Sequence, residues 1–260
     1  MVPGSVITAI NGQTIGSDSD YTPLFNGIAN RKTLVSFTLP SGEKVEEVVL
    51  PISSAALTGL LYQRWVDRNA ELVDSLSGGR LGYVHIKAMN DESYRPMYAK
   101  LLGKYNDCDG VIIDTRYNGG GRMHEDIEVL FSGKKYLNQE IKGEVVGEMP
   151  SRRWNKPSVM LTSEANYSNA HGTPWVYRHV GIGKIIGAPV PGTMSSVNWI
   201  TMQDPTLVFG IPVIGFKTAE GNYLENTQLE PDVKVLNDPS RIIYGIDDQI
   251  SAAVNTLLKD

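Results

Sequence analysis

Two loops carry the residue types that acyl-transfer chemistry requires. The first, residues 114–121 (DTRYNGGG), directly follows an apolar run at residues 110–113. Three consecutive glycines let the backbone approach a ligand closely and point N–H groups at it, as a phosphate site or an oxyanion hole requires. The lysine and Ser/Thr of a P-loop are missing, which disfavours nucleotide binding. A plain glycine-rich turn is the alternative.

The second loop, residues 162–170 (TSEANYSNA), lies between a predicted strand and a predicted helix. Ser168 would then stand at a helix N-terminus, where the helix dipole favours a developing alkoxide or oxyanion. Serine is also a preferred N-cap residue, so capping is the competing interpretation. His171 follows only three residues later, and a base so close in sequence rarely reaches the nucleophile. We therefore interpret His171 as a structural or surface residue.

A third segment contains a carboxylate between apolar and amide neighbours. Residues 222–226 (NYLEN) are followed by residues 230–233 (EPDV). Glu225 is of the type that orients a catalytic histidine, although an acid in an exposed turn is the commoner case.

Composition excludes several classes of protein. The chain has 260 residues, of which 41% are hydrophobic and 20% charged, so it is neither disordered nor too short for a sizeable core. It has no apolar run long enough to span a membrane, and its first residues lack the basic region and apolar run of a signal peptide, so we expect neither feature. A net charge of −5 argues against nucleic acid as the main partner. The single Cys108 excludes an internal disulfide and a cysteine-cluster metal site, and we expect no metal or other cofactor.

Hydrophobic patterning predicts the elements that must position these loops. The first fifty residues predict strands at 5–10, 34–39 and 45–50 and a short helix at 21–30, and residues 54–77 predict a long helix. Beyond residue 80, strands at 81–86, 110–114, 159–162 and 184–188 alternate with helices at 94–105, around 127–131, after 168 and at 246–259. Pro96 is expected in the first turn of its helix. This alternation predicts an α/β fold with a largely parallel sheet.

Taken together, these segments resemble the S41 serine peptidases, and most of all their tricorn-type branch. Residues 4–13 (GSVITAINGQ) are similar to a strand and turn in the second half of the family's PDZ domain. Residues 82–89, 114–121, 162–169 and 224–233 match motifs of the catalytic core in the family's order. The resemblance implies a ClpP/crotonase-like core at residues 81–260, preceded by a linking helix at 54–80 and the C-terminal half of a PDZ domain at 1–53.

The resemblance also assigns roles to individual residues. Ser168 takes the nucleophile's place, and Glu225 that of the carboxylate supporting the base. Gly120 matches the oxyanion-hole glycine, with Gly121 the alternative if the register slips by one. The N–H of Asn169 would be the second donor; the tricorn branch usually has Asp there. Residues 191–196 (PGTMSS) contain no lysine, which disfavours the Ser–Lys dyad of the other S41 branch.

The catalytic histidine is the main departure from the family pattern. In tricorn-type enzymes it lies before the PDZ domain, whereas this chain begins within the resemblance to that domain. None of His85, His171 and His179 matches its position, so we expect a C-terminal fragment that is nearly inactive by itself.

The expected substrate is a peptide or unfolded protein, and a homo-oligomer is among the assemblies that the sequence allows. The resemblance fits either a cytoplasmic or an extracytoplasmic location. Two alternatives stay open: a non-catalytic peptide-binding or structural remnant of the fold, and a crotonase-type acyl-CoA enzyme.

Overall fold

The computed structural model describes residues 1–259, and the chain divides into two compact units. The first comprises Met1–Trp65 and the second begins at Val66. The boundary falls inside helix α1 (Ser54–Ser77). The PDZ-like half and the three-part division of the chain stay predictions.

Unit 1 is built on a four-stranded antiparallel sheet with strand order β2-β1-β3-β4. Asn11 and Gly12, both with positive φ, connect β1 and β2, as expected for an Asn-Gly hairpin turn. Ile10, Val35 and Phe37 form a small buried core. The strands are β1 (Val6–Ile10), β2 (Gln13–Thr14), β3 (Thr33–Thr38) and β4 (Lys44–Val49).

Unit 2 is organised around a parallel five-stranded sheet with strand order β13-β10-β9-β6-β5. Every residue of β6 and β9 is buried, as expected for strands covered on both faces. The strands are β5 (Leu81–His85), β6 (Gly110–Asp114), β9 (Ser158–Thr162), β10 (Lys184–Gly187) and β13 (Val233–Lys234). The predicted α/β class and parallel sheet are confirmed.

Helices of unit 2 pack against this sheet and against one another. Helix α2 contacts β5, helix α6 contacts β9 and β10, and α3 and α4 pack together. One buried cluster joins apolar side chains from β5, β6, β9, β10, α2, α3 and α4. The helices are α2 (Asp91–Leu102), α3 (His124–Phe131), α4 (Asn169–His179), α5 (Pro239–Ile242) and α6 (Asp248–Lys259).

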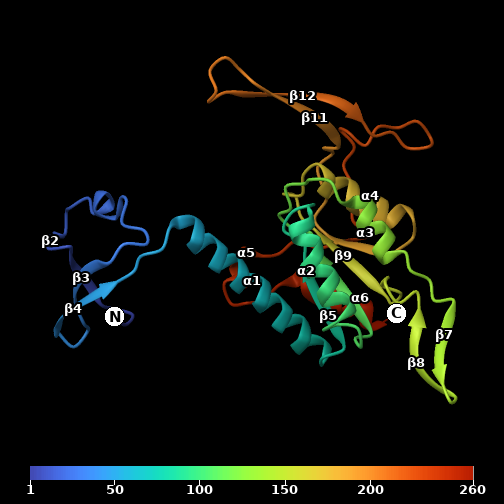
Figure 1. Cartoon of the computed structure of the whole chain (residues 1–260), viewed down its shortest axis with the longest axis horizontal. Helices are drawn as coiled ribbons and strands as arrows, with labels where there is room; N and C mark the ends of the chain where they lie inside the picture. The colour runs from blue at the N-terminus through green and yellow to red at the C-terminus, as the bar shows by residue number, and fades with distance from the viewer. Residues whose placement is uncertain (260) are drawn as a thin grey trace. The chain divides into compact units, whose positions relative to one another are not determined.

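Two antiparallel hairpins extend from the core of unit 2 and were not predicted (Figure 1). One pairs β7 (Leu137–Ile141) with β8 (Glu144–Met149), and the other pairs β11 (Ser195–Thr201) with β12 (Val208–Gly215). Their side chains are mostly exposed, so their sequences lack the alternation of buried and exposed positions that identifies a strand.

Three predicted helices differ in detail from the structure. The segment predicted as a helix at 21–30 holds only the four-residue 3-10 turn η1 (Thr22–Phe25), which buries no residue. Helix α2 ends at Leu102, before Tyr105, and Pro96 is its sixth residue instead of lying in its first turn. Helix α6 begins at Asp248 because Asp247 caps it, accepting a hydrogen bond from the Ile250 N–H at 2.9 Å.

Candidate active site

The charged residues of the glycine loop form a buried network that fastens the C-terminal helix to the sheet. Arg116 is only 1% exposed, and its guanidinium donates to Asp114 (2.6 Å) and to Asp247 (2.8 Å). The hydroxyl of Tyr83 also donates to Asp114, at 2.7 Å. Burial alone would raise the pKa of Asp114, but the Arg116 guanidinium holds it below its ordinary value. Asp114 and Arg116 are thus structural, although they belong to the loop that sequence reasoning marked for chemistry.

Asn118 sets the path of the three glycines. Its side-chain amide donates to the Ile86 carbonyl at 2.8 Å, and its Oδ1 accepts the N–H of Gly120 at 2.8 Å. Its backbone carbonyl accepts the Tyr167 N–H at 3.0 Å. The glycine loop is therefore bonded directly to the loop that precedes α4.

A second set of bonds joins the same two loops. The Tyr117 N–H donates to the Ser163 hydroxyl at 3.0 Å, and the Asn166 amide donates to Thr115 Oγ1 at 2.9 Å. Both loops follow neighbouring parallel strands, β6 and β9. Since the carboxyl ends of parallel strands meet at one edge of the sheet, the fold itself brings the loops together.

Ser168 occupies the N-cap position of α4 in a conformation rare for a side-chain-bearing residue. Its φ is 56° and its ψ −122°. Its N–H donates to Thr193 Oγ1 at 3.1 Å, but its side chain makes no capping hydrogen bond. Within residues 1–259 the hydroxyl has no hydrogen-bond partner. Capping therefore does not account for this serine, and strain of this kind is typical of functional positions.

The glycine loop approaches Ser168 so closely that a side chain would not fit. A Cβ on Gly120, whose φ is 97°, would lie 2.7 Å from the Tyr167 carbonyl oxygen and 2.8 Å from the Ser168 Cβ. It would also lie 3.2 Å from the Asn169 nitrogen. A Cβ on Gly121, whose φ is 137°, would lie 2.2 Å from the Met89 carbonyl oxygen. The structure thus brings Gly120, Ser168 and Asn169 together, and their catalytic roles stay predictions.

This close contact leads to a stability prediction. We expect Gly120→Ala to lower the free energy of unfolding by about 1–3 kcal/mol from backbone strain alone, and more from the overlap with residues 167 and 168. Gly119→Ala is the matched control, because a Cβ there meets nothing within 4 Å, and we expect a change of no more than about 0.5 kcal/mol. Urea unfolding of both variants measures the difference. Equal effects of the two substitutions would contradict the close approach.

Two N–H groups beside Ser168 are available to a ligand. Gly120 has its N–H engaged by Asn118, whereas the N–H groups of Gly121 and Asn169 have no hydrogen-bond partner among residues 1–259. Gly121 forms a parallel bridge to Met89 through its flanking peptide groups, which leaves its own N–H directed away from Met89. Both free donors belong to residues that line a cleft at Ser168.

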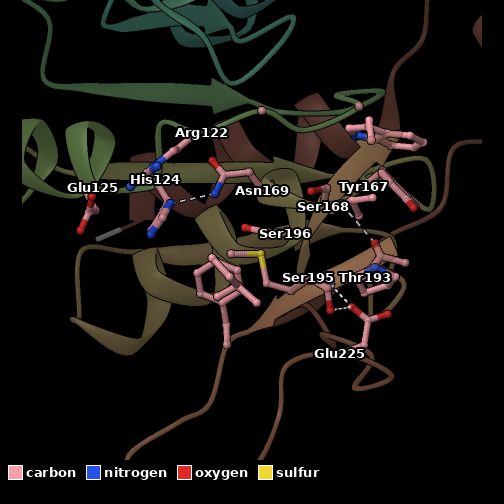
Figure 2. Close-up of a pocket in the computed structure, with 18 residues that line it drawn as sticks. Arg122, His124, Glu125, Tyr167, Ser168, Asn169, Thr193, Ser195, Ser196 and Glu225 are labelled. Carbon is pink, nitrogen blue, oxygen red and sulfur yellow. Dashed lines mark hydrogen bonds between the residues drawn. The ribbon is translucent and has the colours of Figure 1, made fainter. Parts of the chain in front are cut away.

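That cleft has a volume of about 690 Å³ and is lined by five segments of unit 2. The lining comes from the glycine loop with the start of α3, from residues 167–169, from the segment 193–199, from the segment 212–216 and from Glu225; Figure 2 shows several of these side chains. The apolar lining comes mainly from the β11–β12 hairpin: Val197, Trp199, Pro212 and Ile214, with Phe216 just beyond it. The residues that line the cleft include no lysine.

Glu225 lines the same cleft but does not touch Ser168. Its Oε2 accepts hydrogen bonds from the Met194 N–H and the Ser195 hydroxyl, both at 2.8 Å (Figure 2). The neighbouring Thr193 accepts the Ser168 N–H. Residues 193–195 therefore connect the carboxylate to the serine, and Glu225 is positioned within the site instead of lying free in a turn.

None of the four histidines is hydrogen-bonded to the Ser168 hydroxyl among residues 1–259. His85 contacts the Arg116 carbonyl at 3.0 Å through Nε2, and burial lowers its pKa. His179 is exposed and stacks on Trp175. Burial also lowers the pKa of His171, although the nearby Glu225 carboxylate acts to raise it. The buried Nδ1 of His171 has no hydrogen-bond partner in the described chain.

His124 is the site residue that sequence reasoning missed. It is the first residue of α3 and lines the cleft, with its Nδ1 2.7 Å from the side-chain nitrogen of Asn169 (Figure 2). The available signal in the sequence was that His124 closely follows the three glycines. A residue in that position lies near the same edge of the sheet as the glycine loop. That signal is weak, because a histidine at the start of a helix does not by itself indicate a functional site.

Residues 1–259 contain no cluster of three or more His, Cys, Asp or Glu side chains placed to hold a metal ion. None of the helices within residues 1–259 combines the length and apolar character needed to cross a membrane.

Comparisons with known proteins give a consistent result. A family model described as Peptidase family S41 matches residues 80–235. The tricorn protease of Thermoplasma acidophilum is 22% identical over 258 residues, which cover 99% of this chain and 24% of that protein. The tricorn protease of Thermoplasma volcanium is 23% identical over 265 residues, covering 99% of this chain and 25% of that protein.

A solved structure shares the fold. The crystal structure of the tricorn protease matches with a TM-score of 0.81 at 23% identity, over 98% of this chain and 25% of that one. This chain therefore spans about a quarter of the length of the relatives that it matches.

Proposed function

The chain belongs to peptidase family S41, with tricorn proteases among its relatives, and from this membership we propose that Ser168 is the nucleophile of a serine peptidase module. One observation carries the proposal: the strained Ser168, its hydroxyl unbonded, stands at the start of α4 directly against the glycine loop. A half-buried alcohol in a cleft that free N–H donors also line is the arrangement that acyl transfer uses.

The roles of the remaining residues follow from the chemistry. Ser168 Oγ attacks the carbonyl carbon of the scissile peptide while its proton passes to a base, and the leaving amine later takes that proton. The oxyanion accepts hydrogen bonds from the Asn169 N–H and from the glycine loop. Of the two glycines, Gly121 is favoured as donor, because the Gly120 N–H already bonds to Asn118. Glu225 would orient the base.

We place that base outside residues 1–259. Two observations support this. No histidine of the described chain is hydrogen-bonded to the Ser168 hydroxyl. The chain also covers only 24% of the length of the Thermoplasma acidophilum tricorn protease. The absence of lysine from the cleft lining argues against a Ser–Lys dyad. The substrate would be a peptide or an unfolded protein. Self-association into a homo-oligomer stays a proposal, for which exposed apolar side chains such as Trp199 and Phe209 on the β11–β12 hairpin are the support.

A non-catalytic remnant of the fold is the second candidate, and it is favoured by the lack of any histidine within residues 1–259 that is hydrogen-bonded to the Ser168 hydroxyl. The crotonase-type alternative is less well supported, because such an enzyme needs the two N–H donors but does not require a strained serine beside them. An experiment on Ser168 itself distinguishes these readings.

A peptide boronic acid tests Ser168 without needing the base. Its trigonal boron accepts an electron pair from Ser168 Oγ, the hydroxyl proton leaves to solvent, and a tetrahedral anion forms that mimics the acyl-transfer intermediate. We expect a tetrahedral boron signal by ¹¹B NMR with the wild-type chain and none with Ser168→Ala. Ser196→Ala, which changes another serine of the cleft, should leave the signal in place.

A crystal structure of the adduct would then identify the oxyanion donors. We expect boron bonded to Ser168 Oγ, with one boron oxygen within about 2.7–3.1 Å of the N–H nitrogens of Asn169 and Gly121. Boron bound at another residue, or an adduct that survives in Ser168→Ala, would refute the assignment of the nucleophile.

A further inference from the structure

The side chain of Asn169 is held at both of its polar ends by the first residues of α3. Its Oδ1 accepts the N–H of Met123 at 2.9 Å, and its Nδ2 lies 2.7 Å from His124 Nδ1 (Figure 2). Asn169 is only 4% exposed, so water does not readily replace either bond. These bonds tie residues that are 45 or 46 positions apart in the sequence.

The two bonds together determine the state of the imidazole. A backbone N–H can only donate, so the amide atom that faces Met123 must be the oxygen. The amide nitrogen must then face His124, and because it can only donate, Nδ1 of His124 must accept. His124 is therefore neutral in this arrangement, with its proton on Nε2.

We propose that His124 is a positioning residue that holds the oxyanion donor of Asn169 beside Ser168. The inference rests on the proposed function, in which the Asn169 N–H binds the oxyanion. Asn169 is the first residue of α4, so its fixed side chain also fixes the direction of its own peptide N–H. His124 acts only through Asn169 and does not itself touch the reacting atoms.

Protonation of His124 would open this clamp. A proton on Nδ1 would place two donors against each other at 2.7 Å, and the amide cannot rotate to offer its oxygen without facing its NH₂ group to the Met123 N–H. The oxyanion site would then loosen in acid, whatever group serves as the base. Charged groups around His124 are Arg122 and Glu125 in its own segment, Glu128 one turn along α3, Lys217, which lines a small second cavity with His124, and Glu225, which lines the cleft.

The tautomer can be read directly by long-range ¹H–¹⁵N NMR on the whole chain, with the His124 signals assigned from their loss in His124→Gln. At neutral pH we expect a pyrrole-type Nε2 and an unprotonated Nδ1. As the pH falls, the backbone amide signal of Asn169 should shift with the same midpoint as the His124 ring. A proton on Nδ1 at neutral pH, or an Asn169 amide that ignores the titration, would overturn the inference.

Variants connect the clamp to the site. His124→Phe keeps a ring but has no acceptor, and we expect it to weaken peptide boronic acid binding about two- to tenfold at neutral pH, the fold-change expected for one hydrogen bond. His124→Gln restores an acceptor, so binding at neutral pH should return toward the wild-type value. The additional loss of affinity in acid that we expect for the wild type should be absent from this variant. His179→Gln, at a histidine far from the cleft, is the matched control and should behave as wild type.

The two proposals fail in different ways. If the wild-type chain forms no adduct at any pH, the proposed function is wrong, and the NMR tautomer still reports on the clamp. If the wild type forms the adduct and His124→Phe binds it equally well at every pH, the nucleophile assignment stands and the positioning role of His124 is wrong.

Discussion

Assayed by itself, the 260-residue chain is expected to cleave peptides no faster than about 10³–10⁴ times the uncatalysed rate. This is the residual catalysis that an oxyanion hole and substrate binding supply when a serine-protease triad lacks one member. A serine hydroxyl is a weak nucleophile without an adjacent base, and no histidine among residues 1–259 is bonded to Ser168. Glu225 is not expected to substitute, because it makes no hydrogen bond to Ser168 and its Oε2 instead accepts from Met194 and Ser195.

The measurement is turnover of casein and of chromogenic peptides by the purified chain, with Ser168→Ala as the control. Activity that depends on Ser168 and matches an intact peptidase would contradict the prediction and place the base within the chain. His171 would then be tested first, because it is buried on α4 one turn from Ser168 with a free Nδ1 and lies near Glu225. His85, His179 and His124 would follow.

Removing the Arg116 guanidinium is expected to cost about 3–5 kcal/mol of unfolding free energy, because it leaves buried carboxylates without their partner. In Arg116→Met, Asp114 and Asp247 would lose that partner, and Asp114 is fully buried. Since Asp247 caps α6, the C-terminal helix should loosen first. Because Arg116 belongs to the glycine loop, the same variant should also weaken boronic acid binding at Ser168.

Arg95→Met is the matched control for this experiment. Arg95 pairs with Asp91 four residues earlier on an exposed helix face, where an ion pair contributes no more than about 0.5 kcal/mol. Urea unfolding followed by circular dichroism compares the two variants. A loss of less than about 1 kcal/mol in Arg116→Met would show that the network contributes little, and Asp247→Asn would then be expected to have a similarly small effect.

The strand–helix order of unit 2 could be predicted from the sequence because burial leaves a local pattern. Residues 110–113 and 159–161 are continuous apolar runs, and the structure buries the strands that contain them completely. The hairpins at 137–149 and 195–215 could not be predicted in this way. Their strands are largely exposed, and without a buried face there is no periodic signal.

The roles of residues in the glycine loop depended on contacts that no local pattern records. The sequence marked residues 114–121 for chemistry, but the partner that makes Arg116 structural lies 131 residues later, at Asp247. Asn118 orders the loop through hydrogen bonds to Ile86 and Gly120. Of the three glycines, Gly120 lies against Ser168 and Gly121 lies against Met89.

By itself the sequence determined the class of fold, the two loops that follow β6 and β9, and Ser168 as either a nucleophile or a helix cap. Only the tertiary structure excluded helix capping, through a positive φ at Ser168 and a side chain that makes no capping hydrogen bond, and the nucleophile role stays a proposal. It also brought His124 to Asn169. The physical reason is that periodic burial is encoded locally, whereas a site at the carboxyl edge of a parallel sheet is assembled from loops that only the completed sheet brings together.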